Sequence, residues 1–117
     1  MNYIDGYVLA VPNANRESYT KIATEMAQMF KEFGALSVVE CWGDDVPEGK
    51  LTSFPMAVKC EPQETVVFSW VEWPSRAARD VGMQKAKADP RMQPSAHTMP
   101  FDGKRMILGG FQMIVRA

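Results

Sequence analysis

The chain has 117 residues, of which 46% are hydrophobic and 23% are charged, and its 13 basic and 14 acidic residues give a formal net charge of −1. This length suits one domain, spanning residues 1–117, that buries about two-thirds of its unfolded surface. The near-neutral, interspersed charge argues against a nucleic-acid partner, and no apolar run approaches the roughly 20 residues that span a bilayer. The only cysteines, Cys41 and Cys60, do not form a C-x-x-C pair, so we expect a reduced, cytoplasmic protein.

The first third of the chain predicts a strand followed by a helix. Residues 3–11, YIDGYVLAV, are rich in aromatic and β-branched residues and stop before Pro12, as a strand does. Asn13 or Asn15 could cap the helix by accepting a hydrogen bond from a first-turn amide. Apolar residues then recur at steps of three and four, which predicts one core-facing stripe of Tyr19, Ile22, Ala23, Met26, Phe30 and Phe33. Gly34 can end this helix in a left-handed conformation.

The middle of the chain predicts two strands separated by a polar connection. Residues 35–42, ALSVVECW, form the first of these strands. Residues 43–64 are polar and rich in turn-forming residues, with a short extended piece expected at residues 56–60, MAVKC. Residues 65–73, TVVFSWVEW, are the clearest strand in the chain and stop before Pro74.

The last third predicts a second helix and a final strand. Ser75 can cap a helix that runs to about Ala88, and Asp89-Pro90 ends it because the residue before proline disfavours helical dihedrals. Asp102-Gly103 suits a turn, and residues 105–115 form the last predicted strand. Gly109-Gly110 within that strand indicates either a bulge or a close approach of another group to the backbone.

The order of these elements indicates an α+β protein. Two βαβ halves predict the ferredoxin-like βαββαβ arrangement, in which two helices cover one face of a four-stranded antiparallel sheet. Both sides of the strands are apolar, however: in residues 65–73, Val66, Phe68 and Trp70 alternate with Val67, Val71 and Trp73. Two helices cover one face only, so we expect a homodimer in which a second copy of the sheet covers the other face.

The segment ECWGDDVPEGK, residues 40–50, contains a thiol, an indole and four carboxylates. A calcium loop needs oxygen ligands at alternate positions and a glycine at the sixth, which Asp44 and Asp45 do not supply. Zinc needs several Cys or His ligands at short spacing, and the only histidine, His97, is far along the chain. We therefore expect no metal site here, but a strand end followed by a solvated turn, with Cys41 as a buried structural thiol.

Glu40, Glu72 and His97 are the candidate catalytic residues. The two glutamates lie inside apolar strands, where burial would raise the pKa of a carboxyl group and suit it to general acid–base chemistry. If their strand faces coincide, the two carboxylates would share an aromatic-lined space. The alternative is that both face solvent or pair with Arg105 or Lys59. His97 titrates near neutral pH and lies in a proline-rich loop that could fold over an opening.

Trp42, Trp70 and Arg105 are the candidate substrate-binding residues. The two indoles would form apolar walls of a pocket between sheet and helices, and Arg105 or His97 would orient a polar group of the ligand. No dinucleotide fingerprint and no phosphate-binding loop occurs, so we expect no cofactor. Two functions stay open: a cofactor-independent small-molecule enzyme, or a non-catalytic ligand-binding or stress-associated dimer.

Long blocks of the chain resemble one known family. DGYVLAVP, FKEFGALSVVECWGDDVPEGK, VVFSWVEWPS, DPRM and MPFDGKRMILGGF are similar to the YbaA-like bacterial family of unknown function, and the likeness covers nearly the whole chain. This family in turn is similar to the dimeric α/β-barrel superfamily, in which two ferredoxin-like sheets close around a common barrel. The resemblance implies that fold and a homodimer. Related branches include cofactor-independent monooxygenases and small isomerase-like proteins, but the resemblance implies no catalytic residues.

Overall fold

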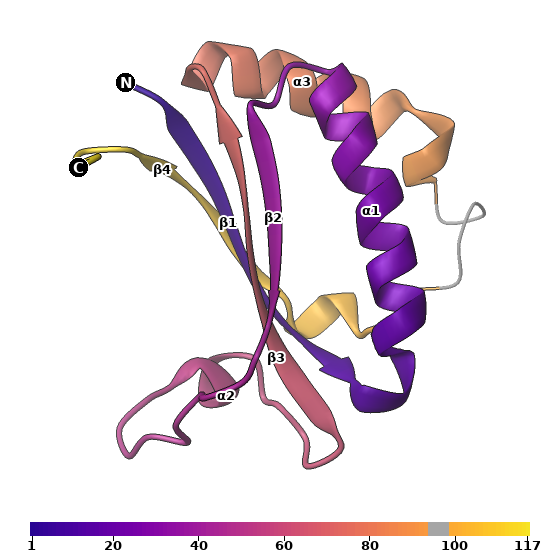
Figure 1. Ribbon diagram of the computed structural model, residues 1–117, viewed down its shortest axis with the longest axis vertical. Helices are drawn as coiled ribbons and strands as arrows, with labels where there is room; N and C mark the ends of the chain where they lie inside the picture. The colour runs from indigo at the N-terminus through magenta and orange to yellow at the C-terminus, as the bar shows by residue number, and fades with distance from the viewer. Residues whose placement is uncertain (94–98) are drawn as a thin grey trace.

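Figure 1 shows the computed structural model of the chain, which describes residues 1–93 and 99–117. Four strands form one antiparallel sheet in the order β2-β3-β1-β4. The strands are β1 (Tyr3–Pro12), β2 (Ser37–Trp42), β3 (Glu64–Trp73) and β4 (Ile107–Gln112). The helices are α1 (Arg16–Glu32), α2 (Phe54–Ala57) and α3 (Arg76–Ala88), with short 3-10 turns at 13–15, 90–92 and 103–105. The predicted α+β class and the order of strands and long helices are confirmed.

In the described part of the chain, no helix is long and apolar enough to cross a membrane.

The two long helices, α1 and α3, lie on the same side of the sheet (Figure 1). We call this side the helix face and the other side the open face. One buried cluster of the helix face is built on the fully buried indole of Trp73, with Tyr3, Ala35 and Val71 around it. A second cluster lies at the other end of the same face and consists of Leu9, Val11, Tyr19 and Val67. The core therefore lies mainly between the helices and the sheet.

The helix boundaries confirm two predictions and correct one. Gly34 follows α1 with a φ of 109°, and the Ser75 hydroxyl accepts a hydrogen bond from the amide of Ala78 at 3.0 Å. Asn15 occupies the N-cap position of α1, but its side chain does not cap the helix. It donates instead to the carbonyl oxygen of Pro100 at 2.9 Å, because the returning chain before β4 passes close to this end of the helix.

Two other predictions need correction. The expected extended piece at residues 56–60 is wrong: Ser53 caps a short helix, α2, by accepting from the amide of Met56 at 3.0 Å, and Pro55 occupies its first turn. The last strand is also shorter than predicted. β4 pairs with β1 in regular register through Gly109 and Gly110, without a bulge. Gly110 instead allows the side chain of Tyr3 to lie close to the backbone, because a Cβ atom at Gly110 would lie 2.3 Å from the hydroxyl oxygen of Tyr3.

The open face is apolar but only partly covered. The segment that contains α2 packs against one end of it, where Val58 is fully buried with Val8, Ala10 and Val66. Beyond this segment the face is exposed in the single chain, with Phe68 44%, Ile107 45% and Phe111 59% accessible. The sheet therefore presents apolar side chains on both sides, as the strand patterns predict.

Candidate functional site

A row of four side chains crosses the helix face from one edge of the sheet to the other. Glu40 in β2 pairs with Ser69 in β3, Ser69 pairs with Tyr7 in β1, and Tyr7 pairs with Leu108 in β4. We call these four residues the central row. Ser69 in the middle is 3% exposed, whereas Leu108 at one end is 66% exposed and Glu40 at the other end is also exposed. The row is thus covered in its centre and accessible from both edges.

Helix α1 covers the Glu40 end of the row. The Tyr19 hydroxyl donates a hydrogen bond to Oε1 of Glu40 at 2.7 Å. One turn earlier in α1, the guanidinium carbon of Arg16 lies 4.9 Å from the ring centroid of Trp42, two residues after Glu40 on the same strand face. Residues three apart in a helix lie on the same face, and so do residues two apart in a strand. Arg16 and Tyr19 of α1 can therefore contact Trp42 and Glu40 of β2 side by side.

The environment of Glu40 favours its protonated form. Although the residue as a whole is exposed, its carboxyl group points under α1, and the loss of water there raises its pKa above the ordinary value. Hydrogen bonds from Tyr19 and Ser69 act in the opposite direction because they stabilise the carboxylate. Desolvation and the bond to Glu40 also raise the pKa of Tyr19, so its hydroxyl stays protonated and keeps donating at neutral pH. Such a carboxyl group is suited to accept and return a proton.

Tyr7 lies next to Ser69 in the same row. Burial raises the pKa of its hydroxyl to about 12, and the negative charges of Asp5 and Glu40 contribute to this rise while Arg79 opposes it. The hydroxyl makes no hydrogen bond to any residue that the structure describes. Tyr7 is therefore a neutral hydrogen-bonding group without a protein partner in the described chain.

A second group of polar side chains adjoins the central row on β1. Asp5, which is 8% exposed, accepts a hydrogen bond from the indole nitrogen of Trp73 at 3.0 Å, and its other oxygen lies 3.5 Å from Nε of Arg79. Arg79 also donates to the hydroxyl of Tyr3 at 2.9 Å and pairs with Asp80 at 3.1 Å. Desolvation raises the pKa of Asp5 despite these partners. The positive charge of Arg79 is thus shared between two carboxylates.

A surface hollow opens between α1 and β2 beside the central row. Its lining includes Gln28 and Lys31 of α1 and Val38 of β2, the residue that precedes Glu40 on the helix face. Another hollow lies where the two ends of the chain meet, lined by Tyr3, Arg76 and Gln112 among others. The first hollow provides a surface depression one strand step from Glu40.

Glu40 and Glu72 do not share a space, because they lie on opposite faces of the sheet. The register pairs Glu40 with Ser69 on the helix face and Ser37 with Glu72 on the open face. Glu72 accepts hydrogen bonds from Asn2 and Arg116, both at 2.6 Å. The aromatic-lined pair of carboxylates considered from the sequence is therefore absent, and Glu72 forms an ion pair with Arg116 rather than with Arg105 or Lys59.

The two tryptophans are separated in the same way. Trp42 lies on the helix face beneath Arg16, whereas Trp70 lies on the open face beside Phe68, with ring centroids 5.7 Å apart. They cannot wall one pocket within a single chain. Cys41 also points to the open face and is exposed, so the expectation of a buried thiol is wrong.

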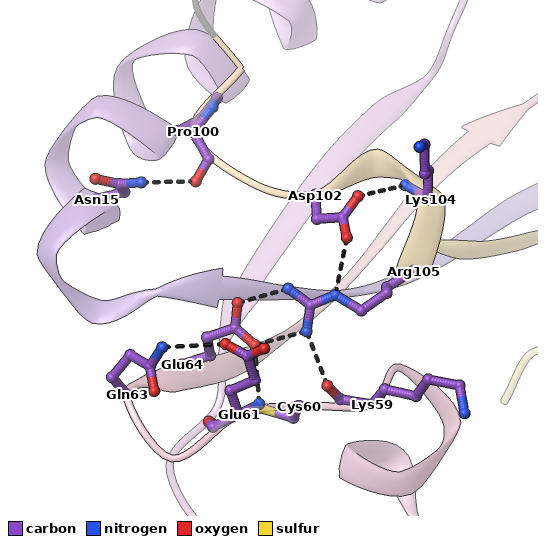
Figure 2. A network of polar contacts seen from close by, with 10 residues as sticks. All are labelled: Asn15, Lys59, Cys60, Glu61, Gln63, Glu64, Pro100, Asp102, Lys104 and Arg105. Atoms are coloured by element: carbon purple, nitrogen blue, oxygen red, sulfur yellow. Dashed lines mark hydrogen bonds and ion pairs between the residues drawn. The ribbon is translucent and has the colours of Figure 1, made fainter.

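Arg105 belongs to a structural network away from the central row (Figure 2). Its guanidinium group donates two hydrogen bonds of 2.7 Å to Glu64 and further bonds to Asp102 and to the carbonyl oxygen of Lys59. These bonds join the starts of β3 and β4 to the end of the α2 segment. His97, the remaining candidate, lies outside the described residues.

The carboxylates of residues 40–50 do not form a metal centre. β2 ends at Trp42, and Asp44, Asp45 and Glu48 are exposed in the irregular segment that follows. Among the described residues, no three His, Cys, Asp or Glu side chains are close enough together to hold a metal ion. The strand end and solvated turn expected for this segment are confirmed.

Asp5, Tyr7 and Tyr19 were missed by sequence reasoning. Asp5 had a usable signal, because it is a charged residue inside an apolar strand, as Glu40 is. Tyr7 and Tyr19 gave no such signal, because an aromatic residue in an apolar strand or in the apolar stripe of a helix is expected to lie in the core. The pairing of β1, β2 and β3 brings Asp5, Tyr7 and Glu40 to one face, and the packing of α1 on that face brings Tyr19 to Glu40.

Comparison with known proteins places this arrangement in a family. Residues 2–103 match the family described as "Protein of unknown function (DUF1428)". The chain is 56% identical over 115 residues to "Uncharacterized protein YbaA" of Escherichia coli (strain K12), and the alignment covers 98% of both chains. The same identity and coverage hold for "Uncharacterized protein YbaA" of Shigella flexneri. The chain therefore belongs to the DUF1428 family, whose function is unknown.

Proposed function

We propose that the protein binds a small molecule between α1 and the sheet and uses Glu40 as a general acid–base group. The observation that supports this most directly is the 2.7 Å hydrogen bond from Tyr19 to a carboxyl group whose pKa is raised by desolvation. Tyr19 holds one carboxyl oxygen in place, and the hollow beside Val38 offers space for a ligand. A carboxyl group with a pKa closer to neutral is a more effective proton acceptor and donor.

Titration of Glu40 by NMR tests the acid–base part of this proposal. We expect a pKa above the ordinary value of a glutamate side chain, because desolvation under α1 disfavours the carboxylate. Tyr19→Phe should raise the pKa of Glu40 further, because it removes a hydrogen bond that stabilises the carboxylate. An ordinary pKa for Glu40, unchanged in Tyr19→Phe, contradicts the proposal.

Thermal unfolding with a panel of small metabolites tests the binding part. A ligand of this site should raise the unfolding temperature of the wild type and have less effect on Glu40→Gln, whereas Glu48→Gln should behave as the wild type. If Glu40→Gln responds fully to the ligand and the pKa of Glu40 is ordinary, the protein is instead a non-catalytic ligand-binding dimer.

We further propose that the fold is ferredoxin-like and that two copies join through their open faces into a dimeric α/β barrel. The strand order β2-β3-β1-β4 supports the first part, and the exposed apolar side chains Phe68, Ile107 and Phe111 support the second. Light scattering should give twice the monomer mass. Phe111→Asp should give the monomer mass, whereas Leu108→Asp on the helix face should not. A monomeric wild type contradicts the dimer.

A cytoplasmic location is also proposed. Cys41 and Cys60 are both free thiols, which is typical of proteins in reducing compartments. Fractionation of cells that produce the full chain tests this, and recovery outside the cytoplasm contradicts it.

A further inference from the structure

A surface hollow of about 460 Å³ lies beside the first turn of α3, where the start of β1 pairs with the end of β4. Figure 1 shows both ends of the chain at this edge of the sheet. We call it the terminal hollow, and its lining consists of residues 1–3, Arg76 and residues 112–114. The terminal hollow contains no residue of the central row, and its volume lies within the range of small-molecule sites.

Arg76 is the cationic side chain of this hollow, and no residue that the structure describes neutralises it. Its side chain makes no hydrogen bond, ion pair or ring contact within the described part of the chain. Every other arginine contacts a carboxylate or the ring of Trp42: Arg16, Arg79, Arg91, Arg105 and Arg116. The guanidinium group of Arg76 can therefore engage a bound group with all of its donors.

The charges around the terminal hollow favour an anion. No aspartate or glutamate is part of its lining. Glu72 contacts the lining by accepting a hydrogen bond from Asn2, but it is also paired with Arg116. Asp80, one turn further along α3, is paired with Arg79. An anion in the hollow would thus meet a positive charge that no neighbouring carboxylate compensates.

The rest of the lining is suited to an apolar part of a ligand. The side chain of Ile114 is 84% exposed, and Met113 beside it is half-buried. Tyr3 forms a fixed wall, because it is buried and its hydroxyl accepts a hydrogen bond from Arg79 at 2.9 Å. A ligand that covers Ile114 would remove apolar surface from water, which stabilises the complex. One cation beside apolar side chains fits an anion that carries an apolar chain.

We propose that the terminal hollow binds a small carboxylate with an apolar chain, whose carboxylate group accepts hydrogen bonds from Arg76 while its chain lies against Met113 and Ile114. The planar fork of a guanidinium group matches the two oxygens of a carboxylate. The side-chain amide of Gln112 makes no hydrogen bond to a described residue and can donate to the same group. A phosphate dianion would bring a second negative charge that no other cationic side chain of the lining balances.

This site goes beyond the proposed function, because it shares no residue with the hollow between α1 and β2. Binding of a carboxylate here does not require the acid–base role of Glu40. The pKa of Glu40 is measured separately, so each of the two proposals can fail without the other.

Titration of the isotope-labelled full chain with hexanoate, followed by NMR, tests the terminal hollow. We expect saturable shifts of the backbone amide signals of residues 112–114. Hexanol and hexylammonium have the same chain without the carboxylate, and each should bind at least about 10-fold more weakly because the hydrogen bonds to a charged group are lost. Acetate keeps the charge but lacks the chain, so it should also bind more weakly than hexanoate.

Matched variants assign the contacts. Arg76→Gln should raise the Kd of hexanoate by at least about 10-fold. Lys85→Gln removes the same charge from an exposed position of α3 outside the lining and should bind as the wild type does. Ile114→Ser should weaken hexanoate by about 5-fold and leave acetate unchanged, because only the chain contacts this residue. Urea unfolding of each variant checks that the fold is retained.

The results that would overturn the site are distinct. Shifts that do not saturate, or equal affinity for hexanol and hexanoate, show that the carboxylate is not recognised. Wild-type binding by Arg76→Gln overturns the contact, and equal losses in Arg76→Gln and Lys85→Gln show an effect of net charge only. Glu40→Gln should bind hexanoate as the wild type does, and a loss in that variant places the ligand elsewhere and overturns the terminal hollow as its site.

Discussion

Gly82 of α3 lies directly against the indole ring of Trp73 in β3. A Cβ atom at Gly82 would lie 2.4 Å from Cζ3 of Trp73 and 2.8 Å from the carbonyl oxygen of Phe33. Trp73 is fully buried and the Phe33 oxygen belongs to the backbone at the end of α1, so neither can easily move. The missing side chain of Gly82 therefore allows α3 to pack this closely on the sheet.

Gly82→Ala should destabilise the protein although alanine is the better helix former. Overpacking against Trp73 costs about 1–3 kcal/mol, and alanine recovers at most about 1 kcal/mol of helix propensity. We expect a lower midpoint in urea unfolding. Gly103→Ala is the control, because nothing lies within 4 Å of the added atom, and its midpoint should be no lower than that of the wild type. Equal midpoints for Gly82→Ala and wild type contradict the prediction.

Asp89→Asn should make stability less dependent on pH in the acid range. Hydrogen bonds from the Arg91 side chain, and then from its backbone amide, lower the pKa of Asp89 to about 2. A lowered pKa contributes stability that is present above the unfolded-state value and is lost as the pH falls toward the folded-state value. The variant should have a lower urea midpoint than wild type at about pH 6, and the difference should shrink toward about pH 2.5. A difference that stays constant with pH argues against this role.

Lys59→Gly should stabilise the protein. Lys59 has a φ of 50° in the residue after the C-cap of α2, a position where glycine is preferred. Glycine removes the strain of the left-handed conformation, but it loses more backbone entropy on folding than lysine does. The net effect should raise the free energy of unfolding by about 0.5–1 kcal/mol. Lys59→Val should lower it, because a β-branched residue tolerates this conformation poorly. Opposite signs for the two variants in urea unfolding are the expected result, and a destabilised Lys59→Gly contradicts it.

Arg105→Met should destabilise the protein much more than Arg116→Met. Arg105 makes two hydrogen bonds to Glu64, whose side chain is only 3% exposed, so the variant leaves a nearly buried carboxylate without its counter-ion. We expect a loss of about 2 kcal/mol. Arg116 also pairs with a glutamate but is itself 60% exposed, and such pairs contribute about 0–1 kcal/mol. Similar losses in the two variants, measured by urea unfolding, contradict the difference in burial.

Local patterns were enough to place most of the secondary structure. β1 and β3 were predicted from alternating residues that stop at Pro12 and Pro74, and both strands end within one residue of these positions. α3 was predicted from the Ser75 cap and the Asp89-Pro90 boundary, both of which the structure confirms. α2 was missed because its four residues depend on Ser53 as a cap, and so short a segment shows no periodic pattern.

Only part of the candidate site could be predicted, because the sequence of a strand does not specify its register with the neighbouring strand. VVECW in β2 and SWVEW in β3 look alike, and each contains one glutamate. A shift of one residue in the pairing moves every side chain of a strand to the other face. The actual register sends Glu40 to the helix face and Glu72 to the open face.

The amino-acid sequence by itself determined which segments form strands and long helices, and that both surfaces of the strands are apolar. These properties depend on neighbours along the chain: side-chain period, capping residues and the dihedral limits of proline and glycine. The tertiary structure decided which carboxylate lies under α1, that Tyr19 contacts it, and that Tyr7 shares its row. Those relationships depend on strand register and on how α1 packs against β2, which join residues far apart in sequence.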